Sequence, residues 1–138
     1  MTNLYTTTAI ATGDGRNGRV ESTDGLLATD VRTPVELGGA GGATNPEQLF
    51  AAGYAACFHS ALKLVAAKDG LDTSDSEVVA DVSLGMLPAG GFGLSAALEV
   101  TLPALDDATA RELVERAHQV CPYSNATRGN IDVRLSVA

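Results

Sequence analysis

The feature that most constrains this chain is a long stretch of apolar and small residues with a marked beginning and end. It runs from Leu49 to Ala67. Before it, Asn45 can cap a helix, Pro46 suits the first helical position, and Gln48 completes a capping-box pattern. After it, Gly70 supplies a stop signal. We therefore predict one long helix that is buried on most of its sides.

The residues before this helix predict three strands. Residues 4–12 are rich in Thr, Ile and Tyr, and the turn sequence GDGRNG (residues 13–18) sends the chain back, so that Arg16 lies near the tip of a hairpin. The segment LLATDVR (residues 26–32) gives a third extended piece. A glycine-rich loop, TPVELGGAGGATN (residues 33–45), then leads into the helix with little tendency toward regular structure.

The residues after this helix predict a hairpin, a second helix and a last strand. Two alternating runs, at residues 82–84 and 94–102, flank the turn LPAGGFG. An amphipathic helix spans about Asp107 to Cys121 and stops at Pro122. After the turn-rich PYSNATRGN, residues 131–137 alternate again. The order βββ-α-ββ-α-β predicts a single α+β domain over residues 1–138, with an antiparallel sheet packed on the long central helix.

Composition and charge narrow the possible partners. The apolar content of 45% favours a folded globule, and the formal net charge of −8 repels phosphate backbones. No basic leader precedes an apolar segment, and no apolar run approaches the roughly 20 residues that span a bilayer. We therefore expect a cytoplasmic protein that binds neither nucleic acid nor membranes.

The chain has two cysteines, one on each predicted helix. Cys57 lies midway along the apolar helix, and Cys121 lies at the carboxyl end of the amphipathic helix, on its buried stripe. Two thiols are too few for a secreted disulfide framework, so reduced core thiols, metal ligands and redox chemistry remain open. A reactive thiolate at Cys57 would need a nearby positive charge, because the helix amino terminus is too distant. Spacing alone does not choose among the candidates, which are Arg16, Arg19 and Arg128.

Three other arrangements of chemically active residues fit less well. Cys57 and His59 point about 200° apart on a helix, so they cannot form a local catalytic pair. The same obstacle faces a zinc site made of Cys57, His59, His118 and Cys121, although His118 and Cys121 could share a metal; we predict no metal and a surface position for His118. The GGAGG segment lacks the Gly-Lys-Ser/Thr ending of a phosphate-binding loop.

Two segments resemble a known family. TNPEQLFAAGYAACF (residues 44–58) and VCPYSNATRGNIDV (residues 120–133) are similar to the signature segments of the organic hydroperoxide resistance family, within the wider OsmC-like group. The turn GRNG and the loop ELGGAGG also match, so the resemblance covers essentially the whole chain. It implies an intertwined homodimer with sites at the subunit interface, which reduces organic hydroperoxides and responds to oxidative stress. The VCPYSNATRGN segment and the short chain favour this family over the OsmC branch proper.

The resemblance also implies a role for each residue of the site. Cys57 matches the peroxidatic thiol, Cys121 the thiol that resolves it, and Arg16 the catalytic arginine. Glu47 matches the carboxylate that pairs with this arginine, although its place in the first turn of a helix is also explained by the helix dipole. No bound cofactor is implied, and the external reductant is a dithiol of the dihydrolipoyl type.

Two further expectations concern the surroundings of Cys57. Ten helical residues, or about 15 Å, separate Cys57 from Glu47, so we predict that Arg16 and Glu47 serve the Cys57 of the partner chain. An apolar lining would favour organic peroxides, and Phe50 and Phe58 are the first candidates for it. The main alternative is a thiol redox sensor or a hydrophobic-ligand-binding protein on the same fold, without turnover.

Overall fold

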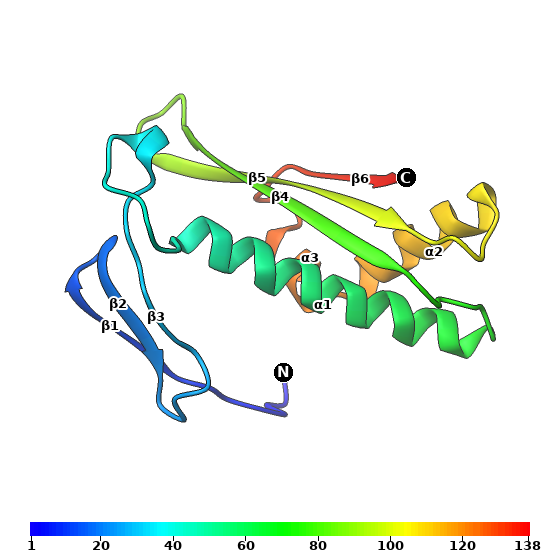
Figure 1. Ribbon diagram of the computed structural model, residues 1–138. Coiled ribbons are helices and arrows are strands. Elements are labelled where there is room, and N and C mark those ends of the chain that lie inside the picture. Colours follow the sequence, from blue (N-terminus) through cyan, green and yellow to red (C-terminus); the bar gives the residue numbers. More distant parts are fainter. The chain divides into compact units, whose positions relative to one another are not determined.

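The computed structural model describes residues 1–138, which divide into two units, Met1–Leu49 and Phe50–Ala138 (Figure 1). The long helix α1, Pro46–Lys68, contributes its first residues to the first unit and the remainder to the second. That the chain forms one domain stays a prediction.

The first unit contains a small antiparallel sheet. Its strands are β1 (Ala9–Asp14), β2 (Asn17–Ser22) and β3 (Ala28–Asp30), in the order β1-β2-β3. Asp14 pairs with Asn17, which leaves only Gly15 and Arg16 in the turn. The predicted place of Arg16 at the hairpin tip is therefore confirmed, although the first strand begins at Ala9 and not at residue 4.

The segment between β3 and α1 is more ordered than the sequence indicates. A short 3-10 helix, η1 (Val35–Leu37), lies in the loop for which we predicted no regular structure. One of the two hydrogen bonds of the predicted capping box at the start of α1 is present: the backbone N–H of Gln48 donates to Asn45 Oδ1 at 2.9 Å. The reciprocal bond is absent, because Gln48 Oε1 instead accepts a hydrogen bond from Thr44 Oγ1 at 2.7 Å.

The second unit contains a mixed sheet. Strands β4 (Glu77–Met86) and β5 (Phe92–Thr101) form the predicted antiparallel hairpin, and β6 (Val133–Val137) pairs with β5. Strands β5 and β6 are parallel, so the predicted antiparallel arrangement is wrong for this one pair of strands. The reason is the helical crossover between them, which returns the chain to the same end of the sheet before β6 begins.

Two consecutive helices form that crossover. Helix α2 (Asp107–Val120) begins at Asp106, whose Oδ1 accepts a hydrogen bond from the Thr109 N–H at 2.9 Å. Helix α3 (Pro122–Thr127) follows directly, where the sequence analysis predicted a turn-rich loop. Pro122 therefore both ends α2 and occupies the first position of α3, which its fixed φ allows.

Helix α1 packs on the sheet and on α2 through one side only. Figure 1 shows it running along the sheet of β4, β5 and β6. Its buried residues contribute to one core with apolar residues of β5 and α2; they are Tyr54, Phe58, Ala61, Leu62, Val65 and Ala66. Ala52, Ala56 and Leu64 are exposed, so the prediction of burial on most sides is wrong for a single chain.

By length and composition, α1 is apolar enough to cross a membrane, which the sequence analysis did not expect. Its polar residues His59, Ser60 and Lys63 hid this, because they interrupt a continuous apolar run. Such a test is also passed by the core helix of a globular fold, and the buried side of α1 shows that it is such a helix.

The hairpin that carries Arg16 depends on a small residue at position 18. A Cβ atom on Gly18 would lie 2.1 Å from the carbonyl oxygen of Thr12, and backbone atoms cannot yield cheaply. We expect Gly18→Ala to lower the free energy of unfolding by about 1–3 kcal/mol, measured by chemical denaturation. Gly85→Ala is the matched control, because a Cβ atom on Gly85 in β4 meets nothing within 4 Å. Equal stability of the two variants would contradict this account.

Candidate active site

The two cysteines of the second unit lie side by side. Cys57 Sγ, in the middle of α1, is 3.8 Å from Cys121 Sγ, and both thiols are free. Cys121 is held at the junction of α2 and α3: its N–H donates to the Ala117 carbonyl, and its own carbonyl accepts from the Asn125 N–H, each at 2.9 Å. The fold therefore brings together two sulfurs that are 64 residues apart in the sequence.

The two thiols differ in their access to solvent. Cys121 is fully buried, whereas Cys57 is partly exposed and opens onto a cavity of about 280 Å³. Apart from Cys57, this cavity is lined by Ser60, Ala61, Leu64, Val120 and Pro122. A molecule in this mainly apolar cavity would reach Cys57 before Cys121.

The two phenylalanines predicted as lining lie elsewhere. Phe58 is fully buried in the core, on the side of α1 that packs against the sheet. Phe50 is partly buried and makes edge contacts with the rings of Tyr54 and Tyr123. Neither lines the cavity beside Cys57 in a single chain, and their place in a substrate pocket stays a prediction. Phe58 follows Cys57 directly in the sequence, and successive residues of a helix point to different faces.

Within the second unit, the surroundings of Cys57 favour its neutral form. Burial raises the pKa of the Cys57 thiol, the backbone N–H of Tyr123 lowers it, and the neighbouring Cys121 raises it further. The net effect is a pKa above the ordinary value. An additional positive charge is therefore needed if Cys57 is to react as a thiolate at neutral pH.

Within the first unit, Arg16 and Glu47 form a two-point ion pair. Arg16 Nη1 donates to Glu47 Oε2 at 2.8 Å, and Nη2 donates to Oε1 at 2.6 Å. These bonds lower the pKa of Glu47 and raise that of Arg16, so both groups stay charged. The pairing implied by the family resemblance is present, and it fixes a planar guanidinium in a way that lysine could not reproduce.

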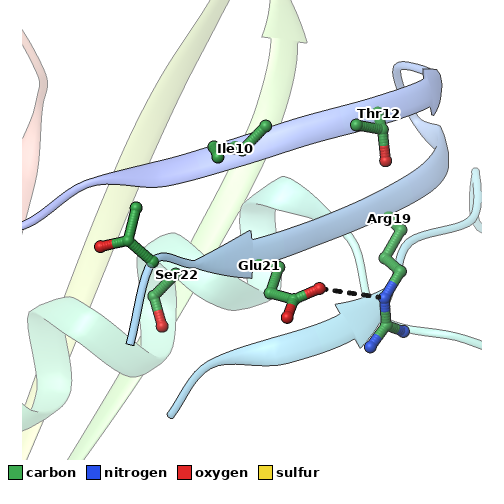
Figure 2. A pocket seen from close by; sticks show the side chains of 6 residues that line it. Ile10, Thr12, Arg19, Glu21 and Ser22 are labelled. Carbon is green, nitrogen blue, oxygen red and sulfur yellow. Dashed lines mark ion pairs between the residues drawn. The ribbon is translucent and has the colours of Figure 1, made fainter. Parts of the chain in front are cut away.

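The other two candidate arginines are engaged in structural contacts. Arg19 pairs with Asp30 at 3.2 Å and with Glu21 at 3.7 Å. Figure 2 shows Arg19 and Glu21 on the face of β2, with Ile10 and Thr12 of β1, around a cavity of about 400 Å³. Arg128 donates to the His118 carbonyl at 2.7 Å, where a cation suits the carboxyl end of α2.

The two histidines have different surroundings. His59 Nε2 lies 2.9 Å from Ser76 Oγ, and burial together with Lys63 lowers the pKa of its imidazole. His118 is partly buried and its buried Nδ1 has no hydrogen-bond partner, so the predicted surface position holds only in part. Burial, together with the charge of Arg128, lowers the His118 pKa and favours the neutral ring.

Several residues that shape the thiol pair are not predicted from the sequence. The ring of Tyr123 lies over Gly53 of α1, where a Cβ atom would come 2.5 Å from the tyrosine oxygen. Tyr54, Ser124 and Thr127 form a buried hydroxyl cluster nearby. Gly53, a glycine inside the predicted helix, is the one sequence signal that indicates this close approach.

A small α+β fold with two adjacent free thiols, one open to an apolar cavity, defines a dithiol protein. The family described as OsmC-like protein matches residues 39–136. An organic hydroperoxide resistance protein from Xanthomonas axonopodis pv. citri is 56% identical, covering 98% of this chain and 95% of that protein.

Solved structures agree with this relationship. The structure of an organic hydroperoxide resistance protein from Legionella pneumophila has a TM-score of 0.95 at 56% identity and covers 99% of each chain. A Vibrio cholerae protein described in the same way, with captopril bound in one of the active sites, has a TM-score of 0.93 at 52% identity and covers 99% of this chain and 94% of that one. The chain therefore belongs to the OsmC-like family and, within it, to the organic hydroperoxide resistance proteins.

The Arg16–Glu47 pair makes a prediction about stability and pH. Because the pKa of Glu47 is lowered in the folded chain, its contribution is present above the unfolded value of about 4.3 and is lost as the pH falls below it. We expect Glu47→Gln to cost about 1 kcal/mol at neutral pH, a modest figure because solvent screens the partly exposed Arg16.

Chemical denaturation over a pH series measures this difference, which should shrink as acid protonates Glu47 in the parent chain. Glu36→Gln is the control, because Glu36 is exposed and has no ion pair. A difference that stays constant down to acid pH would show that the charge of Glu47 does not stabilise the fold.

Proposed function

We propose that this chain is a thiol peroxidase that reduces organic hydroperoxides to alcohols through Cys57 and Cys121. The observation that carries the proposal is the 3.8 Å approach of the two reduced sulfurs, with one thiol open to an apolar cavity and the other buried behind it. The names of the relatives, as organic hydroperoxide resistance proteins, support the substrate class.

The first step is attack of the Cys57 thiolate on the peroxide. The sulfur forms a bond to the terminal oxygen, the O–O bond breaks, and the remaining alkoxide takes a proton and leaves as an alcohol. Cys57 is oxidised to a sulfenic acid, and the peroxide is reduced. A thiolate is required, because the neutral thiol is a poor nucleophile.

The second step forms a disulfide. The Cys121 thiolate attacks the sulfur of the Cys57 sulfenic acid, and hydroxide leaves as water once protonated. An external dithiol, which we propose to be of the dihydrolipoyl type, then reduces the disulfide by two thiol exchanges and is itself oxidised. The chain needs no bound cofactor for these steps.

We assign Arg16 the role of stabilising the Cys57 thiolate and orienting the peroxide, and Glu47 the role of holding the guanidinium. Two observations support this assignment. The two-point ion pair holds the Arg16 guanidinium in a fixed orientation, and the raised pKa of Cys57 within its own unit means that a cation is needed to form the thiolate. We retain the hypothesis of a homodimer in which Arg16 of one chain serves Cys57 of the other.

Substrate preference would follow from the apolar cavity. Leu64, Val120 and Ala61 offer apolar contacts beside Cys57, and each methylene of a substrate that they bury contributes about 0.8 kcal/mol. Hydrogen peroxide has no such group. An organic hydroperoxide would therefore be favoured, in the cytoplasm or wherever a dithiol reductant is available.

Turnover assays test the function directly. With dihydrolipoamide as donor, we expect cumene hydroperoxide to be reduced much faster than hydrogen peroxide, and thioredoxin to be a poor donor. Cys57→Ser removes the nucleophile and should abolish turnover. Without a donor, Cys121→Ser should still consume one peroxide per chain and accumulate the sulfenic acid, because the chain has no second thiol to condense with it. Disulfide formation without turnover by any donor would favour the redox-sensor alternative.

The role of Arg16 is tested by titrating Cys57. In a Cys121→Ser background, we expect Arg16→Ala to raise the pKa of Cys57, followed by thiolate absorbance, and to lower kcat/KM for the hydroperoxide by about 100-fold in chains that retain both cysteines. Arg19→Ala is the matched control, since Arg19 is engaged by Asp30 and Glu21. An unchanged pKa in Arg16→Ala would remove Arg16 from the mechanism.

Mixing a weakened variant with an inactive one tests action across the dimer. A pair of an Arg16→Ala chain and a Cys57→Ser chain carries one intact Cys57 and one intact Arg16 on different chains. We expect activity to return after the two are unfolded and refolded together. If the mixture stays inactive although mixed dimers form, Arg16 acts within its own chain.

A further inference from the structure

Three hydroxyl groups are buried together between α1 and α3. Tyr54 and Ser124 are 0% exposed and Thr127 is 2% exposed. The Tyr54 hydroxyl lies 2.9 Å from Ser124 Oγ and 3.2 Å from Thr127 Oγ1, and Thr127 Oγ1 also donates to the Ser124 carbonyl at 3.1 Å. The three groups satisfy one another without reaching solvent.

This hydroxyl cluster runs beside the thiol pair. Tyr54 lies three residues before Cys57 on α1, and Ser124 lies three residues after Cys121. Residues three apart on a helix are neighbours on one face. The bond between Tyr54 and Ser124 therefore joins the same two segments as the Cys57–Cys121 approach, about one helical turn away from it.

The hydrogen bonds of the hydroxyl cluster fix the orientation of α3 on α1 more closely than apolar packing would. Helix α3 has six residues, too few for stability without packing. Its buried residues are the two hydroxyl residues Ser124 and Thr127, and the hydroxyl groups of both lie within hydrogen-bond distance of the Tyr54 hydroxyl on α1. Buried polar groups of this kind can specify one arrangement among several that an apolar contact would tolerate.

A second contact depends on the same docking. The Tyr123 ring lies over Gly53 and makes an edge contact with Phe50, while the Tyr123 backbone N–H favours the charged form of Cys57. The short segment that carries Ser124 and Thr127 therefore contacts both cysteines: it follows Cys121 directly, and its Tyr123 N–H lowers the pKa of Cys57.

We propose that Tyr54, Ser124 and Thr127 are positioning residues that hold Cys121 against Cys57 and so set the rate of disulfide formation. The inference deepens the proposed function and rests on it for its biological meaning, since disulfide formation is its second step. The sulfurs must move from 3.8 Å to the bonding distance of about 2.05 Å. A misplacement on the order of 1 Å costs about 100-fold in such an intramolecular step.

An aromatic disulfide reagent, dithiobis-nitrobenzoate, separates the two steps without any peroxide. Cys57, the more exposed thiol, attacks the reagent and forms a mixed disulfide, which releases one coloured thiolate. Cys121 then attacks the Cys57 sulfur, which forms the protein disulfide and releases a second coloured thiolate. The first release depends on reagent concentration, and the second does not.

We expect Tyr54→Phe to leave the first release within about twofold and to slow the second by about tenfold or more. With cumene hydroperoxide, the same variant should accumulate sulfenic acid that a nucleophilic trap captures. An unchanged second release would overturn the proposal. Equal slowing of both releases would also overturn it, because that would indicate a general change of the fold.

Conservative replacements separate positioning from stability. Thr127→Val removes the hydroxyl and should slow the second release, whereas Thr127→Ser keeps it and should restore the rate. This pair decides the question if Tyr54→Phe does not fold. Tyr5→Phe, at an exposed tyrosine, and Val100→Ala, at a buried position of β5 without a hydroxyl group, should leave the ratio of the two rates unchanged.

The reagent also distinguishes failure of this proposal from failure of the proposed function. A chain without peroxidase activity would still show both releases, with the second slowed in Tyr54→Phe. A working peroxidase whose second release ignores Tyr54 and Thr127 would refute only the positioning role.

Discussion

The chemistry proposed for this chain depends on how a six-residue helix sits on a long one. Helix α3 brings Cys121 to within 3.8 Å of Cys57 and places the Tyr123 N–H to favour the charged form of Cys57. Because so short a helix has little stability of its own, its contacts with α1 decide whether the two sulfurs meet. The buried hydroxyl cluster and the glycine beneath Tyr123 are therefore part of the site as much as the thiols themselves.

Burial places the two thiols in apolar surroundings, and these surroundings disfavour the thiolate form of Cys57. The same apolar surroundings that would admit an alkyl peroxide raise the pKa of Cys57. Within the first unit, the Glu47 carboxylate holds both terminal guanidinium nitrogens of Arg16, and we propose that this oriented cation compensates for the raised pKa of Cys57. Arg16 lies at the tip of a two-residue hairpin turn in the first unit, and Cys57 lies on a helix in the second unit.

The sequence allowed much of this to be predicted, and the failures share a physical cause. Strong local signals, such as the turn around Arg16 and the buried stripe of α2 that ends at Cys121, gave the right elements. The cysteine pairing and the Arg16–Glu47 contact came from family resemblance and not from spacing. The parallel β6, the helical α3 and the core position of Phe58 depend on packing between distant segments, which no local pattern encodes.

The most direct test is to treat the reduced chain with one equivalent of cumene hydroperoxide and count what is consumed. The account predicts that one peroxide yields one alcohol, that both free thiols disappear, and that peptide mapping finds Cys57 joined to Cys121 within one chain. Loss of a single thiol, or a disulfide that joins two chains, would contradict it.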